Sequence, residues 1–328
     1  MTTPRAVRLT EFGPPEVLRL EAVELPPPAG GEARLRQTAV GFNYIDVYQR
    51  SGRYPLPLPT GLGHEAAGVV EALGDGAAAE GLAVGDRVVY MNAGIGAYAS
   101  HRNVAAARLV RIPDGVSDED AAAVFFKAMT AQYLLRRTCR VQPGDVVLVH
   151  AAAGGVGQIL CRWAKALGAF VVGTTGSPSK CEAALAAGCD AAIDYSQPDW
   201  VRQAIEATGD RKARVVYDSV AQHTFLGSLD CAAPFGMVVL FGAASGPAPA
   251  IDPELLNKKG CLFLTRPSVF PHNADAATLR ANAAEVFEAM ASGAVRAAIG
   301  ARFALDEAAE AHRAAESRRV TGAIVMLP

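Results

Sequence analysis

Short stretches in which apolar and polar residues alternate fill the first third of the chain. Glycine and proline separate these stretches, and the clearest break is Pro26-Pro27-Pro28 followed by Gly30-Gly31. An alternation with a period of two residues is typical of strands that are buried on one side. We therefore expect a compact, barrel-like β domain with strands at residues 6–9, 17–20, 33–40, 68–73 and 86–90.

The pattern changes near Ser117, which precedes three acids and is typical of a helix N-terminus. From residue 142 onward, short β-branched runs alternate with stretches of helical length. This alternation predicts an α/β domain with a doubly wound parallel sheet. Its six expected strands are residues 146–150, 170–174, 192–195, 215–218, 237–241 and 261–265. A helix near 275–292 and strands near 302–304 and 323–327 are expected to return to the first domain.

The most specific motif follows the first strand of this sheet. Residues 151–157 read AAAGGVG, between a buried strand that ends at His150 and a helical stretch. Gly154 would let the backbone approach a pyrophosphate, Gly157 would let helix and strand come close, and the helix N-terminus supplies N–H donors. Ala152 replaces the first glycine of the GxGxxG fingerprint. The surrounding strands favour a dinucleotide site over a glycine-rich turn in a sheet without nucleotide.

The end of the second strand of the sheet bears on the choice between NADH and NADPH. NADH sites place an Asp or Glu there, and its carboxylate binds the ribose 2′-hydroxyl. Residues 171–180, VVGTTGSPSK, contain no acid. They offer hydroxyls and one cation instead, from Thr174, Thr175, Ser177 and Lys180. Since hydroxyls and a cation suit a 2′-phosphate, the sequence predicts NADPH. The alternative for Lys180 is a solvated lysine at a helix start.

Composition and charge exclude several classes of protein. The chain has 328 residues, enough for two domains, and 51% of them are apolar, which excludes a disordered chain. Its 31 basic and 33 acidic residues give a net charge of −2, so binding to nucleic acid or to an anionic membrane is not expected. No apolar run has the roughly 18–20 residues that span a bilayer, and the N-terminus lacks the apolar core of a signal peptide. Six scattered cysteines without a CxxC pair add to the expectation of a cytoplasmic protein.

Three segments together resemble a known superfamily. AAAGGVG after a strand, GFNYIDVYQRSGRYP at residues 41–55 and GHEAAGVVEALG at residues 63–74 are similar to segments of the medium-chain dehydrogenase/reductases. Within that superfamily, the whole chain most resembles the zinc-independent NADPH:quinone oxidoreductases, the zeta-crystallin-like branch. The resemblance implies a GroES-like, β-rich catalytic domain at residues 1–124 and 267–328 and a Rossmann NADPH-binding domain at residues 125–266. It also implies a homodimer in which the last Rossmann strands pair across subunits.

The superfamily includes zinc alcohol dehydrogenases, so a metal site has to be considered. Their catalytic zinc is held by a Cys, by the His of a GHE segment and by a second Cys. Here His64 keeps the GHE segment, but Asn43 stands at the first Cys position and no cysteine precedes Cys139. One imidazole cannot form a three-ligand catalytic site. We therefore expect no metal, and we expect His64 to pack at the cleft or to contact the substrate.

The resemblance implies an enzyme that transfers reducing equivalents from NADPH to a quinone in the interdomain cleft. A quinone is a strong acceptor, so the protein has to supply position, a dry cleft and hydrogen-bond donors. Two alternatives stay open. One is an NADPH-dependent reductase of the C=C bond of alkenals and enones, and the other is a nucleotide-binding protein with little turnover.

The same resemblance assigns roles to individual residues. Orientation of the substrate and nicotinamide is expected from Asn43, Asp46, Tyr48 and Tyr54. The alternatives are a structural hydrogen-bond acceptor for Asp46 and ordinary packing for the two tyrosines. Besides Gly154 and Gly157, contacts with the cofactor are expected from Tyr44, Ile45, Tyr48, Lys127, Tyr133, Gly155, Val156, Gly176, Ser177, Lys180, Tyr195, Ser219, Val220, Phe241, Gly242, Ala243, Ala244, Pro267, Ser268 and Arg318.

Overall fold

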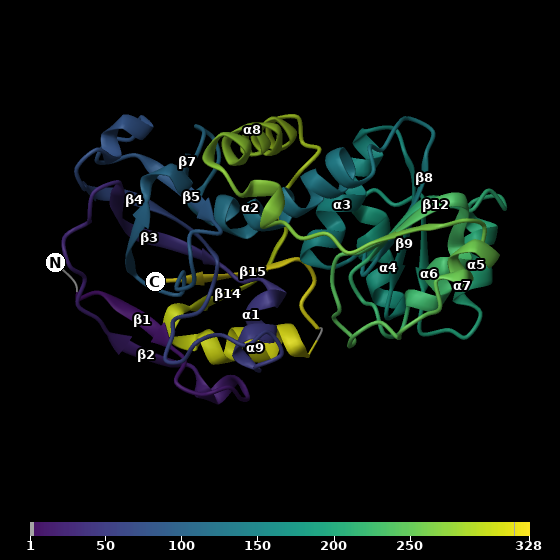
Figure 1. The fold of residues 1–328 in the computed structure, drawn as a ribbon, viewed down its shortest axis with the longest axis horizontal. Coiled ribbons are helices and arrows are strands. Elements are labelled where there is room, and N and C mark those ends of the chain that lie inside the picture. The colour runs from purple at the N-terminus through teal and green to yellow at the C-terminus, as the bar shows by residue number, and fades with distance from the viewer. Residues whose placement is uncertain (1–2, 318) are drawn as a thin grey trace. The chain divides into compact units, whose positions relative to one another are not determined.

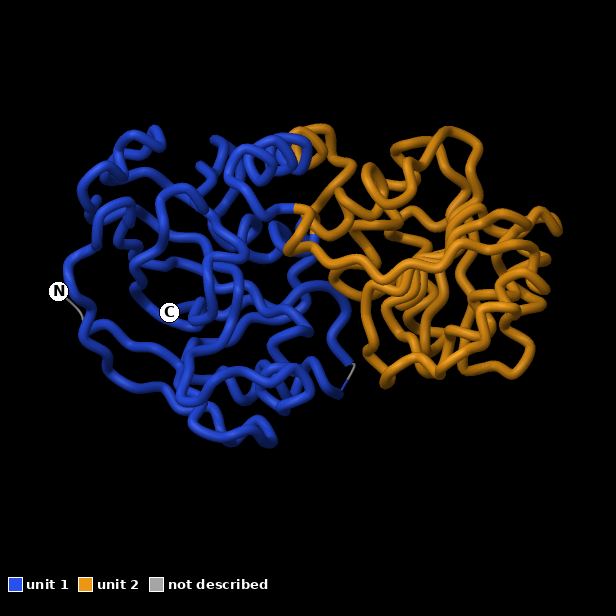
Figure 2. The backbone as a smooth tube through the Cα atoms, in the orientation of Figure 1, with its two compact units in different colours: residues 1–127, 273–287, 297–328 blue, residues 128–272, 288–296 orange. Residues whose placement is uncertain are grey.

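The chain folds into two compact units (Figure 2). A computed structural model describes residues 3–317 and 319–328, so the predicted cofactor contact Arg318 lies outside the described residues. The first unit contains residues 1–127, 273–287 and 297–328, and the second contains residues 128–272 and 288–296. Both ends of the chain therefore belong to the first unit.

The first unit is built on a sheet of seven strands (Figure 1). Six lie in the order β14-β15-β3-β4-β5-β7, and β6 pairs with β3. Their bounds are β3 (Glu32–Gly41), β4 (Glu65–Leu73), β5 (Arg87–Met91), β6 (His101–Ala105), β7 (Leu109–Arg111), β14 (Ile299–Ala304) and β15 (Ala323–Leu327). Met326 of β15 lies opposite Val40 of β3, which joins the end of the chain to its first third. Two further strands, β1 (Arg5–Arg8) and β2 (Arg19–Ala22), form a separate ribbon.

Apolar side chains from both ends of the chain form the core of this unit. Leu35 and Tyr90 from the sheet, Leu9 from the N-terminal segment and Ala311 from α9 are fully buried in it. Its helices and short helical turns are α1 (Tyr44–Arg50), α9 (Ala308–Glu316), η1 (Pro15–Val17), η2 (Ala77–Glu80), η3 (Ala106–Arg108) and η6 (Leu305–Glu307). Three elements have residues in both units: α2 (Asp118–Tyr133), α8 (Ala276–Ala291) and η5 (Pro271–Asn273).

The second unit contains a parallel sheet of six strands. They lie in the order β10-β9-β8-β11-β12-β13. Counted along the chain this is the order 3-2-1-4-5-6 of Rossmann sheets, which bind ligands at the carboxyl ends of their strands. The strands are β8 (Val146–His150), β9 (Phe170–Thr175), β10 (Ala191–Asp194), β11 (Ala213–Asp218), β12 (Ala232–Leu240) and β13 (Phe263–Thr265). The helices are η4 (Leu134–Thr138), α3 (Gly155–Ala166), α4 (Pro178–Ala186), α5 (Trp200–Ala207), α6 (Phe225–Cys231) and α7 (Glu254–Lys258).

The structure confirms the predicted doubly wound parallel sheet and a β-rich unit. Several strand boundaries differ from the prediction: β4 begins at Glu65 and β13 at Phe263, for example, and two further differences follow. The strand expected at residues 17–20 begins only at Arg19, because Pro15 has a fixed φ and starts a short helical turn instead. Strand β12 begins at Ala232, five residues before the expected start, and Phe235 has a φ of 60° within it. Among the described residues, no helix combines the length and the apolar character needed to cross a membrane.

Candidate active site and cofactor site

The glycine-rich turn links β8 to α3 and has the geometry of a phosphate site. Gly154 is the N-cap of α3, and Gly155, Val156 and Gly157 form its first turn. A Cβ at position 157 would lie 2.2 Å from the carbonyl oxygen of Ala151, so only glycine fits there. Gly154, Gly155 and Val156 are partly exposed, which leaves the N-terminus of α3 accessible to an anion. The residues present therefore fit a dinucleotide pyrophosphate.

The segment after β9 has the features that the NADPH prediction requires. Ser177 is the N-cap of α4, Lys180 lies in its first turn, and both are partly exposed. Gly176 lies beside Tyr195, since a Cβ at position 176 would be 3.1 Å from the tyrosine hydroxyl. The structure thus brings together Gly176, Ser177 and Tyr195 where β9 and β10 end.

Two hydroxyls that the sequence suggested for the 2′-phosphate are not available to it. Thr174 is fully buried, and its Oγ1 lies 2.6 Å from Nδ1 of His150. Thr175 is also buried and donates to the carbonyl oxygen of Ser177 at 3.0 Å. The prediction was wrong for both threonines, because the last residues of β9 are covered within the second unit.

The loops after β11 and β12 hold the next group of predicted cofactor contacts. The N–H of Ala244 donates to the carbonyl of Ser219, and a Cβ at position 242 would lie 2.7 Å from the same oxygen. Ser219, Val220 and residues 241–244 therefore form one packed pair of loops at the carboxyl ends of the strands. Tyr133 is buried and stacks on His272, with ring centroids 4.5 Å apart. Pro267 and Ser268 directly follow β13 and Arg266.

In the first unit, a buried ion pair anchors the start of α1. Asn43 precedes α1, and its side-chain amide donates to Oε2 of Glu65 at 2.9 Å. Lys127 Nζ lies 3.5 Å from the same oxygen, and the backbone N–H of Phe126 donates to Oε1. Burial raises the pKa of Glu65, and the charge of Lys127 opposes that rise. Lys127, expected at the cofactor, is thus buried and paired with Glu65.

A second buried chain of hydrogen bonds runs from α1 to α9. Oδ2 of Asp46 accepts from the N–H of Asn43 at 3.0 Å and from the hydroxyl of Tyr98 at 2.9 Å. The Tyr98 oxygen lies 3.2 Å from Nε2 of His312, and Arg50 donates to Nδ1 of the same ring at 3.2 Å. Because Arg50 is only a donor, the imidazole is neutral with its proton on Nε2. Burial raises the pKa of Asp46 to about 7, and burial together with the charge of Arg50 lowers the pKa of His312 to about 3.

Three tyrosines expected near the nicotinamide and the quinone lie together. Tyr44 and Tyr54 each pack edge-on against Tyr48, with ring centroids 5.3 Å and 5.1 Å apart. The guanidinium of Arg53 lies 4.7 Å from the centre of the Tyr48 ring. Tyr48 is 9% exposed and Tyr54 is 37% exposed, so Tyr54 presents the more accessible ring.

His64 and its neighbours do not fit a catalytic zinc. Nε2 of His64 donates to Oε1 of Gln49 at 3.0 Å, and burial lowers the pKa of the ring to about 4. The side chain of Asn43, at the expected position of a cysteine ligand, is bonded to Glu65. Within residues 3–317 and 319–328, no three His, Cys, Asp or Glu side chains are grouped so that they could hold a metal ion. A catalytic zinc site takes three protein ligands, with water or substrate in the fourth position.

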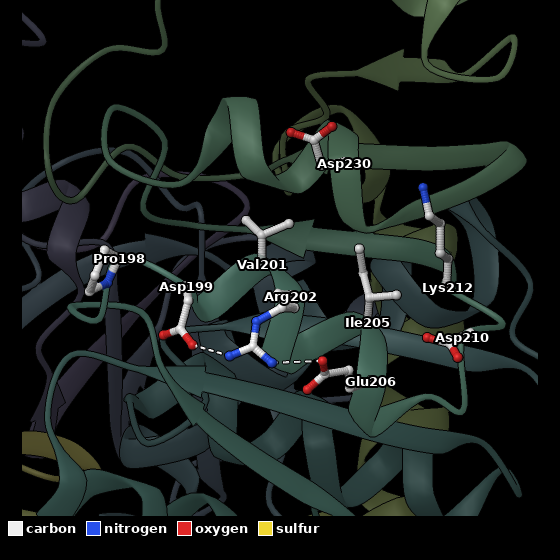
Figure 3. A pocket seen from close by; sticks show the side chains of 9 residues that line it. All are labelled: Pro198, Asp199, Val201, Arg202, Ile205, Glu206, Asp210, Lys212 and Asp230. Carbon is white, nitrogen blue, oxygen red and sulfur yellow. Dashed lines mark hydrogen bonds and ion pairs between the residues drawn. The ribbon is translucent and has the colours of Figure 1, made fainter.

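A depression of about 520 Å³ lies beside α5 on the second unit (Figure 3). Arg202, at its centre, is paired with Asp199 at 2.5 Å and with Glu206 at 2.7 Å. Lys212, on its rim, directly precedes β11, so this depression is at the amino end of that strand. The cofactor contacts predicted for the loops of the parallel sheet follow the carboxyl ends of its strands, and no predicted contact that the structure describes lines this depression.

The partners that hold α1 in place are not indicated by the sequence. Tyr98 and His312 are 52 and 214 residues away from the residues that they contact, Asp46 and Tyr98. No short motif joins positions so far apart. For Glu65 a local signal existed, because it belongs to the GHE segment together with His64.

Comparison with known proteins places this geometry among related enzymes. One family model, described as an alcohol dehydrogenase GroES-like domain, matches residues 29–114, and another, described as a zinc-binding dehydrogenase, matches residues 155–292. A quinone oxidoreductase of Pseudomonas aeruginosa is 45% identical over 325 residues, which are 99% of each chain. A 2-haloacrylate reductase of a Burkholderia species is 40% identical over 96% of each chain. The crystal structure of Escherichia coli quinone oxidoreductase complexed with NADPH matches with a TM-score of 0.95 and 41% identity, over 99% of this chain and all of that one.

Proposed function

Because the chain belongs to the quinone oxidoreductase family of the medium-chain dehydrogenase/reductase superfamily, we propose that it is an NADPH-dependent quinone reductase. The observation that carries this proposal is the match over nearly the full length to a quinone oxidoreductase complexed with NADPH. The second unit supports it, since the turn before α3 fits a pyrophosphate and the segment after β9 has Lys180 in place of a carboxylate. Residues 125–266 are assigned to NADPH binding, and residues 1–124 and 267–328 to catalysis.

When bound, NADPH supplies the hydride, and the protein supplies position and exclusion of water. Asn43 and Asp46 are buried and fix the start of α1, so we assign them as positioning residues. Tyr48 and Tyr54 present aromatic rings and are assigned to orienting the nicotinamide and the quinone. The contacts around Gly176, Ser177 and Lys180 are assigned to the 2′-phosphate.

The proposed reaction is independent of zinc. Support comes from the donor set, because His64 is bonded to Gln49 and the Asn43 amide to Glu65. A quinone needs no Lewis acid, since its reduced oxygens are stabilised by the aromatic ring. Elemental analysis of protein purified without chelators is expected to find less than stoichiometric zinc, and one firmly bound zinc per chain would contradict this part of the proposal.

A homodimer is part of the same proposal, with β13 as the pairing element. This strand is at the edge of the parallel sheet, and its Phe263 is 58% exposed. Phe235, on the neighbouring strand β12, is 73% exposed. Exposed apolar edge strands favour pairing with another chain. We also propose a cytoplasmic location, supported by six free cysteines, and no strong nucleic-acid binding, supported by the net charge of −2.

Reduction of an activated C=C bond is the second candidate, favoured by the 40% identity with a 2-haloacrylate reductase. Steady-state NADPH oxidation with 1,4-benzoquinone, an alkenal and 2-chloroacrylate distinguishes the two candidates. We expect kcat/KM for the quinone to exceed that for either alkene by about tenfold or more. A higher value for an alkene would favour the second candidate. Tight NADPH binding without turnover of any of these acceptors would contradict both.

A further inference from the structure

Four fully buried polar side chains connect the strand ends of the second unit. His150 is the last residue of β8, and its Nδ1 lies 2.6 Å from Oγ1 of Thr174 on β9. Its Nε2 lies 2.9 Å from Oγ of Ser228 on α6, and Ser228 donates to Oδ2 of Asp218 at 2.8 Å. Asp218 is the last residue of β11. We call His150, Thr174, Asp218 and Ser228 the strand-end network.

The hydrogen bonds of this network have one consistent direction. The hydroxyl of Ser228 has one proton and two acceptors in reach, Oδ2 of Asp218 at 2.8 Å and the carbonyl oxygen of Thr224 at 3.1 Å, so it accepts from Nε2–H of His150. With its proton on Nε2, His150 accepts at Nδ1 from the hydroxyl of Thr174. Burial lowers the pKa of His150 although Asp218 opposes this effect, so the ring stays neutral. Asp218 also accepts from the backbone N–H of Val220 at 2.8 Å, so the network ends on the loop after β11.

The network contacts the elements assigned to NADPH without itself being exposed. His150 directly precedes the glycine-rich turn, and Thr174 lies two residues before Gly176. The ring of His150 packs edge-on towards Tyr195, with centroids 6.4 Å apart, and Tyr195 in turn lies beside Gly176. The turn assigned to the pyrophosphate and the segment assigned to the 2′-phosphate are therefore joined through a buried imidazole, in addition to the backbone N–H of Ala152, which donates to the carbonyl oxygen of Thr174 at 3.0 Å.

From this geometry we infer that His150 is a positioning residue that sets the preference for NADPH over NADH through the strand-end network. The inference rests on the proposed function. Both cofactors share the pyrophosphate and differ at the 2′ position. Without the bond between His150 and Thr174, the backbone bonds of β8 and β9 alone hold the start of the segment after β9, and its position relative to the turn is less fixed. The contacts with the 2′-phosphate are then misplaced, while those with the pyrophosphate remain.

Isothermal titration of NADPH and NADH into purified variants tests the inference without relying on turnover. Thr174→Val and Ser228→Ala each remove one hydroxyl of the network. We expect Kd for NADPH to rise about tenfold in each variant, and Kd for NADH to change by less than about twofold. Thr174→Ser keeps the hydroxyl and is expected to keep the wild-type ratio of the two constants.

Thr208→Val is the matched control. Thr208 is also buried, and its hydroxyl donates to the carbonyl of Ile205 at 2.6 Å at the C-terminus of α5. We expect this variant to lose stability but to keep the wild-type ratio of Kd values. A ratio that changes as much in Thr208→Val as in Thr174→Val would show a general effect of destabilisation and overturn the inference.

An unchanged ratio in Thr174→Val and Ser228→Ala would also overturn it. If Thr174→Val does not fold, Ser228→Ala decides alone, since alanine suits a helix. A wild-type protein without preference for NADPH would contradict the proposed function itself. The two failures are therefore distinguishable.

Discussion

Replacing His312 by glutamine is expected to make the stability of the protein less sensitive to acid. His312 is fully buried and accepts from Arg50 at Nδ1, so protonation would place a second cation beside the guanidinium. Arg50 is held there by two hydrogen bonds to Glu316, at 2.9 Å and 2.8 Å. A glutamine amide offers an acceptor and a donor without a titrating proton.

The size of the effect follows from the pKa of His312. Burial and the charge of Arg50 lower this pKa from 6.5 to about 3. Between these values the unfolded chain binds a proton that the folded protein does not. Above pH 6.5 the ring is neutral in both states and costs the folded protein no stability. As the pH falls from 6.5 towards 3, protonation of the unfolded chain lowers the free energy of unfolding. At about pH 5 the loss from this residue is about 2 kcal/mol. Burial lowers the pKa of His64 to about 4, so this residue also reduces the free energy of unfolding in acid. His312→Gln still contains His64 and shows this second reduction as well.

Urea denaturation at about pH 7 and about pH 5 measures this difference. Between the two pH values we expect His312→Gln to lose about 2 kcal/mol less unfolding free energy than the wild type does. The comparison of the two losses in unfolding free energy is valid even if the variant is less stable than the wild type at both pH values. His223→Gln is the control, because His223 is exposed, and it should follow the wild type. Equal losses in the wild type and in His312→Gln would show that His312 is not a source of this acid sensitivity.

Three further predictions concern the proposed cofactor site and the proposed pairing of two subunits. Lys180→Ala is expected to raise KM for NADPH about tenfold and to change KM for NADH little, because we assign the lost cation to the 2′-phosphate; equal changes in both would contradict the assignment. Gly157→Ala is expected to abolish NADPH binding or folding, measured by calorimetry and thermal melting, because its methyl group would lie 2.2 Å from the carbonyl oxygen of Ala151; wild-type affinity would contradict this. Phe263→Asp is expected to give a monomer in sedimentation velocity. Leu226→Asp is the control, because Leu226 is also exposed but lies on α6, and it should not change the oligomeric state. A Phe263→Asp protein that stays dimeric would contradict pairing through β13.

The parallel sheet could be predicted because its signals are local. Strand β8 begins and ends where the sequence predicts, since a short, mostly β-branched run is bounded by turn residues. The glycine-rich turn is equally local, and the structure places it at the expected strand end. The start of β12 was missed because Pro234 and Gly236 are typical of a turn. In the structure the strand continues through them, with Phe235 at a positive φ.

The buried networks could not be predicted in the same way. His150 and Ser228 are 78 residues apart, and Tyr98 and His312 are 214 residues apart, so only the folded chain brings them together. Thr174 shows a second reason. Its residue type fits a contact with a phosphate, but the side chain is turned to His150 inside the unit. A residue type at a strand end indicates possible chemistry, whereas the packing of the neighbouring elements decides where the side chain points.

We propose that this chain uses NADPH to reduce a quinone without a metal. The most direct test of this proposal is the yield of hydroquinone from 1,4-benzoquinone, measured by chromatography under anaerobic conditions with chelator-treated wild-type protein. We predict about one hydroquinone for each NADPH oxidised, with kcat/KM for NADPH about tenfold or more above that for NADH. NADPH binding without hydroquinone formation, or activity that returns only when zinc is added, would contradict the account.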